Sequence, residues 1–585
     1  MLKKLLWISI GLVFFIVIVH GIIIQIRTER GTDMPKLNLP LGTDDFKMIR
    51  EKKNTFYYTD KSLMIQEFIE NFYAVTLITR PRRFGKTLNM TMIREFFDLN
   101  RDSYSLFEGL KIMGTEYARF LNTVPVIFLS LKDCNGDTVE DMKDAMVKVV
   151  YQEFHRYATL FGNNIDENSF ELEEFINTFS KLKNHRNGKS RIDNTAFQNS
   201  LKTLTGAIYK FYDIRPMVMI DEYDQPWIQA HEKGYREQFS SGYATFLSSV
   251  LKGNEYLNRA LLTGIQRIAK ESVFSKLNNL TVCTVENDKY KNFFGLTPQE
   301  TAQALETFGL ELTEEIKDYY DGYRFAGLEI YNPWSIFSYI DEKKLKPYWV
   351  NTSTNKLIRD AFASADSEFM ESFEELITEG EAEVMINLEA SFIELKQTDT
   401  LWGLLVNAGY LTITDQYSES FMTVKIPNSE SKKEFRTLVS KYTHIENNLL
   451  EMMFDTLSKG DMKKFLKFYK TIIDKCTSYH DAKENAYHML LLGMSISVLD
   501  LYDITSNLES GDGRSDILMK SRQPLLRPHV IFELKEGENI KKLSEEALQQ
   551  IHDRRYYTNL TGDVLCVGIA HNKKNCELVS EQISR

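Results

Sequence analysis

Short apolar runs of strand length recur along the first half of the chain, separated by longer stretches with a helical pattern. The apolar runs lie at 74–78, 125–131, 217–220 and 261–264. The helical stretches repeat apolar residues every three or four positions, at 88–97, 139–161 and 195–212. Apolar runs without alternating polar positions are typical of strands that are buried on both faces. The pattern predicts a parallel β-sheet with helices on both faces, and we expect the polar stretch 162–194 to form a loop or insertion.

The pattern changes after Phe294. Thr297 and Glu300 have the spacing of a capping box, which marks the start of a mostly helical region. Residues from about 335 to 470 have helical patterns and few residues that suggest chemistry. Near the C-terminus we expect a helix, a turn leading into strands, a second helix and a further strand, ending at 564–570. The chain therefore divides into four expected parts, 1–33, 34–330, 331–475 and 476–585.

The N-terminus is apolar enough to cross a membrane. Residues 5–26 are almost wholly apolar, with basic residues on both sides. About 20 apolar residues span a bilayer core, and no small-residue cleavage pattern follows this run. We expect a hydrophobic helix that anchors the protein in a membrane, with the bulk of the chain in the cytoplasm. The alternative is that the protein starts at Met34 and that 1–33 is an upstream extension.

Composition and charge narrow the classes of function. The chain has 585 residues, of which 43% are hydrophobic and 26% charged, as in a globular protein of several domains. The net charge is −11, so nucleic acid could be bound only through local basic patches. The five cysteines are scattered without C-x-x-C spacing, which argues against a disulfide framework or a zinc site.

The segment 79–87, with the sequence TRPRRFGKT, carries the clearest chemical signal. It follows an apolar run and precedes a helical stretch, as a phosphate-binding loop (P-loop) does. In a P-loop, backbone amides cradle the phosphates, the lysine reaches the β- and γ-phosphates, and the hydroxyl binds Mg²⁺. We therefore assign Arg83, Gly85, Lys86 and Thr87 to nucleotide binding, with Thr87 as a metal ligand. The general P-loop pattern has glycine at the position of Arg80.

Two acids end the apolar run 217–220. Asp221 is expected to hold Mg²⁺ beside the nucleotide, and Glu222 to orient or deprotonate an attacking water. Alone, this motif is better explained as an ordinary strand followed by an acidic turn, and only together with Lys86 and Thr87 does it favour a nucleotide site. Thr263, at the end of the run 261–264, is a candidate sensor of the γ-phosphate. Arg267 is a second candidate, with a solvated or salt-bridged helix residue as the alternative.

A second group of candidate catalytic residues lies near the C-terminus. Glu533 and Lys535 are two residues apart in an apolar strand-like run, so they share one face, and Asp516 opens a strand expected beside it. Two carboxylates over one space offer the oxygen ligands that Mg²⁺ prefers, and the lysine would assist hydrolysis of a phosphodiester. The pattern D–x(n)–E–x–K is loose, and chance matches are common. Nearby basic pairs are explained either as phosphate contacts or as a solvated face.

The motifs resemble those of the predicted AAA-ATPase-like proteins that carry a C-terminal PD-(D/E)xK nuclease-like domain. The resemblance is carried by the segments RPRRFGKT at 80–87, IDEYD at 220–224, LTGIQRIAKESVFSKLNNL at 262–280, and 509–535. It covers nearly everything from Met34 onward, and arginine at position 80 is usual for that family. It implies an α/β fold with a P-loop NTPase-type sheet and a restriction-endonuclease-like C-terminal domain. Glu484 and Gln550 match positions that assist the metal site in related nucleases, although Glu484 could equally have a structural role.

These observations predict an ATP-binding P-loop ATPase coupled to a Mg²⁺-dependent nuclease-like domain, with ATP and Mg²⁺ as cofactors. Nucleic acid is the expected partner, residues 5–26 provide a membrane contact, and a homo-oligomer is left open. The alternative is a nucleotide-controlled switch whose C-terminal domain binds without cleaving. A complete set of Asp516, Glu533 and Lys535 favours cleavage, because a binding module is free to lose one of them.

Overall fold

The computed structural model describes residues 37–162, 169–267, 279–349, 367–388, 398–432, 447–476, 484–495, 498, 501–510 and 513–584. The predicted N-terminal anchor at 5–26 lies outside these residues. In the described ranges, no helix has the length and apolar character needed to cross a bilayer.

The expected parallel sheet is present and contains five strands in the order β2-β3-β4-β1-β5. The strands are β1 (Val75–Thr79), β2 (Val126–Ser130), β3 (Met217–Asp221), β4 (Ala260–Gly264) and β5 (Leu280–Cys283). Every residue of β1, β3 and β4 is buried, as the uninterrupted apolar runs predict. Because β4 lies between β1 and β3, the carboxyl ends of these three strands meet at one edge of the sheet.

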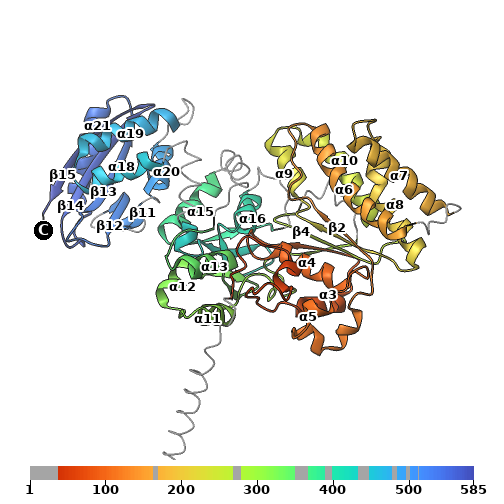
Figure 1. Cartoon of the computed structure of the whole chain (residues 1–585). Helices are drawn as coiled ribbons and strands as arrows, with labels where there is room; N and C mark the ends of the chain where they lie inside the picture. Colours follow the sequence, from red (N-terminus) through yellow and green to blue (C-terminus); the bar gives the residue numbers. More distant parts are fainter. Residues whose placement is uncertain are drawn as a thin grey trace, which may run out of the picture.

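Helices cover the sheet and form a layer beside it (Figure 1). They are α2 (Phe46–Arg50), α3 (Leu63–Asn71), α4 (Lys86–Phe97), α5 (Tyr104–Phe107), η1 (Lys111–Gly114), η2 (Glu116–Phe120), α6 (Val139–Phe161), α7 (Phe170–Arg186), α8 (Asn194–Tyr212), α9 (Gln225–Glu232) and α10 (Arg236–Leu251). Helix α7 packs against α6 and α8, and α8 also packs against α10.

Helix α7 corrects the prediction that 162–194 is a loop. Leu172, Phe175 and Leu182 form a narrow apolar stripe that is buried against neighbouring helices. The ring of Phe175 stacks on that of Phe154 in α6, with the centroids 5.1 Å apart. The many polar residues of this stretch lie on the opposite, solvated face of a real helix, where they obscure the periodic pattern.

The middle region (residues 298–476) is not purely helical, which corrects the prediction of helical patterns from about 335 to 470. It contains α11 (Pro298–Thr307), α12 (Glu314–Tyr320), α13 (Pro333–Glu342), α15 (Ser367–Thr378), α16 (Thr398–Ala408), α18 (Asn447–Ser458) and α19 (Met462–Cys476). It also contains the hairpin β6 (Tyr323–Phe325) and β7 (Leu328–Ile330), and an antiparallel sheet in the order β8-β10-β9. Those strands are β8 (Glu381–Met385), β9 (Thr412–Gln416) and β10 (Phe421–Lys425). All three are only five residues long, and β8 and β9 are partly exposed, so their apolar positions are too few to stand out from helical patterns.

The C-terminal domain has the expected order of elements plus one further strand. The elements are α20 (Glu484–Ser495), β11 (Tyr502–Ser510), β12 (Gly513–Ser521), β13 (His529–Glu536), α21 (Ile540–Asp553), β14 (Val564–Asn572) and β15 (Asn575–Ile583). The strands form one mixed sheet in chain order, in which only β13 and β14 are parallel. Helix α21 packs on the sheet, and so does α19, whose Phe465 ring lies 6.1 Å from that of Phe532.

The middle region connects the two ends of the protein. Helix α15 packs against α20 and β11 of the C-terminal domain, as Figure 1 shows. A single hydrophobic cluster includes Val75 of the first sheet, Trp349 and Phe369 of the middle region, and Phe532 of the last sheet. The three parts therefore share a continuous apolar core.

Candidate nucleotide and nuclease sites

The P-loop (residues 80–87) joins β1 to α4 with the geometry of a phosphate cradle. Gly85 is the N-cap residue of α4 and has φ of 86°, in the left-handed region that glycine tolerates. Arg83 also has a positive φ, of 71°. The buried Lys86 donates hydrogen bonds from Nζ to the carbonyl oxygens of Arg80 (3.0 Å) and Pro81 (3.1 Å). The lysine thus spans the loop in which a phosphate would be bound.

Arg80 occupies the position of the missing glycine without entering the cradle. Its fully buried guanidinium donates to the carbonyl oxygens of Thr79 (2.8 Å) and Cys283 (2.9 Å). It also lies over the rings of Phe294 and Phe325, 5.3 and 5.2 Å from their centroids. Burial lowers the pKa of Arg80 to about 10. Because the side chain points into the core, glycine is not required at this position.

The structure brings Thr87, Asp221 and Thr263 together at the carboxyl edge of the sheet. The hydroxyl of Thr87 donates to Oδ2 of Asp221 (2.8 Å), and that of Thr263 donates to Oδ1 (2.6 Å). Burial raises the pKa of Asp221, and both hydrogen bonds oppose this shift. A hydroxyl and a carboxylate side by side at a helix N-terminus are suitable ligands for the Mg²⁺ of a bound nucleotide.

Glu222 and Asp224 follow in the turn after β3. Glu222 has a positive φ of 50° and lines the cavity beside the P-loop. Burial lowers the pKa of Lys86, and the largest opposing influence is the charge of Glu222. Asp224, for which the sequence predicts no role, is buried and accepts from the backbone amides of Ile265 (2.8 Å) and Gln266 (3.1 Å). Burial raises the pKa of Asp224 to about 6.

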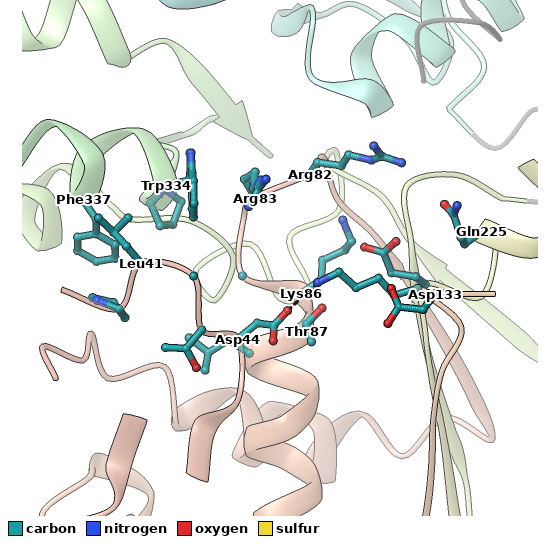
Figure 2. A pocket seen from close by; sticks show the side chains of 18 residues that line it. Leu41, Asp44, Arg82, Arg83, Lys86, Thr87, Asp133, Gln225, Trp334 and Phe337 are labelled. Carbon is teal, nitrogen blue, oxygen red and sulfur yellow. Dashed lines mark hydrogen bonds and ion pairs between the residues drawn. The ribbon is translucent and has the colours of Figure 1, made fainter. Parts of the chain in front are cut away.

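The cavity at this site has a volume of about 510 Å³, within the range of small-molecule sites (Figure 2). Its polar residues include Arg82, Arg83, Lys86, Thr87, Lys132, Asp133, Glu222 and Gln225. Its apolar residues include Pro40, Leu41, Leu88, Pro333, Trp334 and Phe337. The contributions of 40–44, 132–133 and α13 could not be predicted from the sequence, because these segments reach the P-loop only through the tertiary fold. Arg267 is half-buried and is not among the described residues that line the cavity.

The C-terminal constellation forms on the face of the sheet that α21 covers. Strands β12 and β13 are antiparallel, and the pair Ile517–Phe532 places Asp516 and Glu533 at the next position. The backbone amide of Leu534 donates to Oδ2 of Asp516 (2.6 Å). Gln550 of α21 bridges the other two residues: its Oε1 accepts from Lys535 Nζ (2.9 Å), and its Nε2 donates to Glu533 Oε1. Hydrogen bonds thus join Glu533, Lys535 and Gln550, and Asp516 lies opposite Glu533 on the neighbouring strand.

Burial and charge at this site suit a cation. Glu533 is 3% exposed. Burial raises the pKa of Asp516. The hydrogen bond from the backbone amide of Leu534 and the charges of His488 and Lys535 act in the opposite direction and lower it. Within the described part of the chain, no group of three or more His, Cys, Asp and Glu side chains is arranged to hold a metal. Two carboxylates still fit Mg²⁺, which keeps several waters and completes its coordination with substrate phosphate. Glu484 begins α20, and its side chain is outside the described part.

Two further residues support this site and were not predicted. Gln550 also donates from Nε2 to the hydroxyl of Tyr556 (3.4 Å). Burial raises the pKa of Tyr556, and the charges of Glu533 and Asp516 add to the shift. Gly568 of β14 pairs with Glu533, and a Cβ there would lie 2.5 Å from the backbone nitrogen of Leu548 in α21. Glycine at 568 thus lets α21 approach the sheet closely.

Comparison with known proteins matches the two stretches of chain in which these candidate sites lie. Residues 40–274 match the family model described as predicted AAA-ATPase, and residues 482–581 match the PD-(D/E)XK nuclease superfamily. The two matches cover separate parts of the chain. Over 541 residues it is also 25% identical to a protein of Azotobacter chroococcum mcd 1 named "Uncharacterized protein in vnfD 5'region", covering 89% of this chain and 93% of that protein. The resemblance drawn from the sequence motifs is confirmed.

Proposed function

We propose that this protein is an ATPase whose nucleotide state controls a Mg²⁺-dependent nuclease domain acting on nucleic acid. The main support for nuclease chemistry is the convergence of Asp516, Glu533 and Lys535 on one sheet face, with Gln550 joining the last two. The support for nucleotide binding is the P-loop beside the buried Asp221.

At the ATP site, the backbone of the P-loop and Lys86 would bind the phosphates, and Thr87 and Asp221 would hold Mg²⁺. Glu222 reaches the cavity from the turn after β3, where it can orient or deprotonate the attacking water. Thr263 donates to Asp221 and would hold that carboxylate at the carboxyl edge of the sheet.

At the nuclease site, Asp516 and Glu533 would hold Mg²⁺. The ion supplies a Lewis acid for the phosphodiester and lowers the pKa of a bound water. Lys535 is held by Gln550 and would stabilise negative charge that develops on the phosphorus oxygens. The net charge of −11 implies that nucleic acid is bound through local basic residues.

The test is cleavage of supercoiled plasmid DNA and of single-stranded RNA with Mg²⁺ or Mn²⁺, with and without ATP. We expect cleavage that requires the metal, is lost in Asp516→Asn and changes with ATP in the wild type but not in Lys86→Ala. Cleavage that persists in Asp516→Asn would show that a contaminating nuclease or another site is responsible.

A non-cleaving switch is the second candidate. One observation favours it: Gln550 is hydrogen-bonded to both Glu533 and Lys535, the two groups that would otherwise contact the metal and the substrate. ATP hydrolysis without cleavage of either nucleic acid, under every metal condition, would support the switch.

A further inference from the structure

Every residue of the P-loop turn between Arg80 and Gly85 contacts the middle region. A Cβ on Gly409 would lie 3.0 Å from Cβ of Pro81, so the Pro81 ring packs closely against the backbone of Gly409. The indole Nε1 of Trp349 donates to the carbonyl oxygen of Arg82 (3.4 Å). The ring of Phe84 lies 5.1 Å from that of Tyr323. The fourth contact, between Arg83 and Trp334, is the one that faces the cavity.

Arg83 is placed where a charged side chain can reach a bound nucleotide. It is exposed, lines the cavity and belongs to the loop that would wrap the phosphates. Its guanidinium carbon lies 4.2 Å from the centroid of the Trp334 ring, which is a close cation–π contact. This contact with the indole restrains the Arg83 side chain. Figure 2 shows the two side chains together beside the P-loop.

Trp334 is itself held firmly by the middle region. It lies in the first turn of α13, where the side chain of Asn332 accepts from its backbone amide (2.9 Å). Its indole Nε1 donates to the carbonyl oxygen of Tyr348 (3.1 Å). The next residue, Ser335, donates to the buried Glu430 (2.8 Å). A ring fixed in this way can restrict the rotamers of an arginine stacked on it.

We propose that Trp334 is a positioning residue of the nucleotide site: its ring holds Arg83 over the cradle so that the guanidinium engages the β- and γ-phosphates. The inference rests on the proposed ATP site and deepens it, because it makes the middle region part of that site. The ligand is a nucleoside triphosphate. Trp334 contributes to its affinity only indirectly, by holding Arg83 against the terminal phosphates.

The test is a double-mutant cycle on nucleotide affinity in the full chain, with Mg²⁺-ATP and AMP as probes. We expect Arg83→Ala to weaken ATP binding by about fivefold to tenfold and Trp334→Ala by about threefold to fivefold. The double variant should be no weaker than Arg83→Ala alone. Trp334→Phe keeps an aromatic face and should restore most of the affinity. AMP lacks the terminal phosphates, so its affinity should change less than twofold in every variant.

Arg83→Lys gives a second route that leaves α13 intact, in case Trp334→Ala does not fold. An ammonium keeps the charge but loses the planar stacking, so ATP binding should weaken by about threefold. Additive losses in the cycle, or an equal loss of AMP affinity in Trp334→Ala, would overturn the inference while leaving the ATP site in place. A wild-type chain that binds no ATP would instead overturn the proposed function, and this inference with it.

Discussion

Replacing Gly568 by alanine tests the nuclease site through the packing of one helix. A Cβ at this position would lie 2.5 Å from the backbone nitrogen of Leu548 and 3.1 Å from Cβ of Ala547, both in α21. Non-bonded carbon contacts are stable at about 3.5 Å, so α21 must move away from the sheet by about 1 Å. Overpacking of this kind costs about 1–3 kcal/mol of stability.

The same movement displaces Gln550, which lies in α21 two residues after Leu548. Gln550 joins Glu533 to Lys535, and a displacement of about 1 Å in a catalytic arrangement can reduce a rate by about 100-fold. We therefore expect Gly568→Ala to lower the melting temperature of the C-terminal domain and to reduce plasmid cleavage by about 10- to 100-fold, while ATP binding is unchanged.

The matched control is Gly114→Ala, because a Cβ on Gly114 meets no atom within 4 Å. That variant should match the wild type in melting temperature, ATP binding and cleavage. If Gly568→Ala keeps both the wild-type melting temperature and cleavage within twofold, α21 is not seated closely on the sheet and Gln550 does not support the site.

Four other substitutions test separate features of the two sites. Lys86→Ala should weaken ATP binding by at least about 10-fold in a calorimetric titration. Glu222→Gln should bind ATP normally and hydrolyse it slowly. If Lys86→Ala binds ATP as well as the wild type does, residues 80–87 do not form a nucleotide-binding P-loop. Asp516→Ala should abolish cleavage without unfolding the domain, since it removes one of two close carboxylates, and ATP binding should persist. Because burial raises the pKa of Asp224 from 3.8 to about 6, its ionisation destabilises the fold as the pH rises through this range. Asp224→Asn lacks that cost. Its unfolding free energy should therefore exceed the wild-type value by up to about 3 kcal/mol above pH 6 and by little near pH 4. A difference that does not depend on pH would contradict the raised pKa of Asp224.

Parallel strand order explains why the meeting of Thr87, Asp221 and Thr263 could be predicted from the sequence. Thr87, Asp221 and Thr263 each follow or end an apolar run, and parallel strands deliver their carboxyl ends to one edge. The meeting of Glu533 and Lys535 was predictable in the same way from the two-residue period of a strand. These predictions needed only local pattern and chain direction.

Residues that reach a site through tertiary packing could not be predicted. Trp334 lies some 250 positions after the P-loop in the sequence, and nothing near it indicates a nucleotide. Gly568 looks like any glycine in a strand until α21 is placed against it. The inward direction of Arg80 depends on the rings of Phe294 and Phe325, which come from other elements. In each case the role of the residue depends on its contact with a segment that is distant in the sequence.

The strength of the P-loop contacts limits how ATP can act on the C-terminal domain. Any nucleotide effect at the nuclease site has a route through the middle region, which contacts both the P-loop turn and, through α15, the elements α20 and β11. An exposed cation–π contact contributes about 0.5–1 kcal/mol, so the Arg83–Trp334 pair alone can shift a conformational equilibrium only about twofold to fivefold. A switch from mostly inactive to mostly active requires about 5.5 kcal/mol. If ATP changes cleavage more than about 100-fold, the contacts of Pro81, Arg82 and Phe84 with the middle region must change together with that of Arg83. Substitution of Trp334 alone would then reduce the ATP response only modestly, whereas loss of the whole response in Trp334→Ala would mean that this one contact carries the coupling.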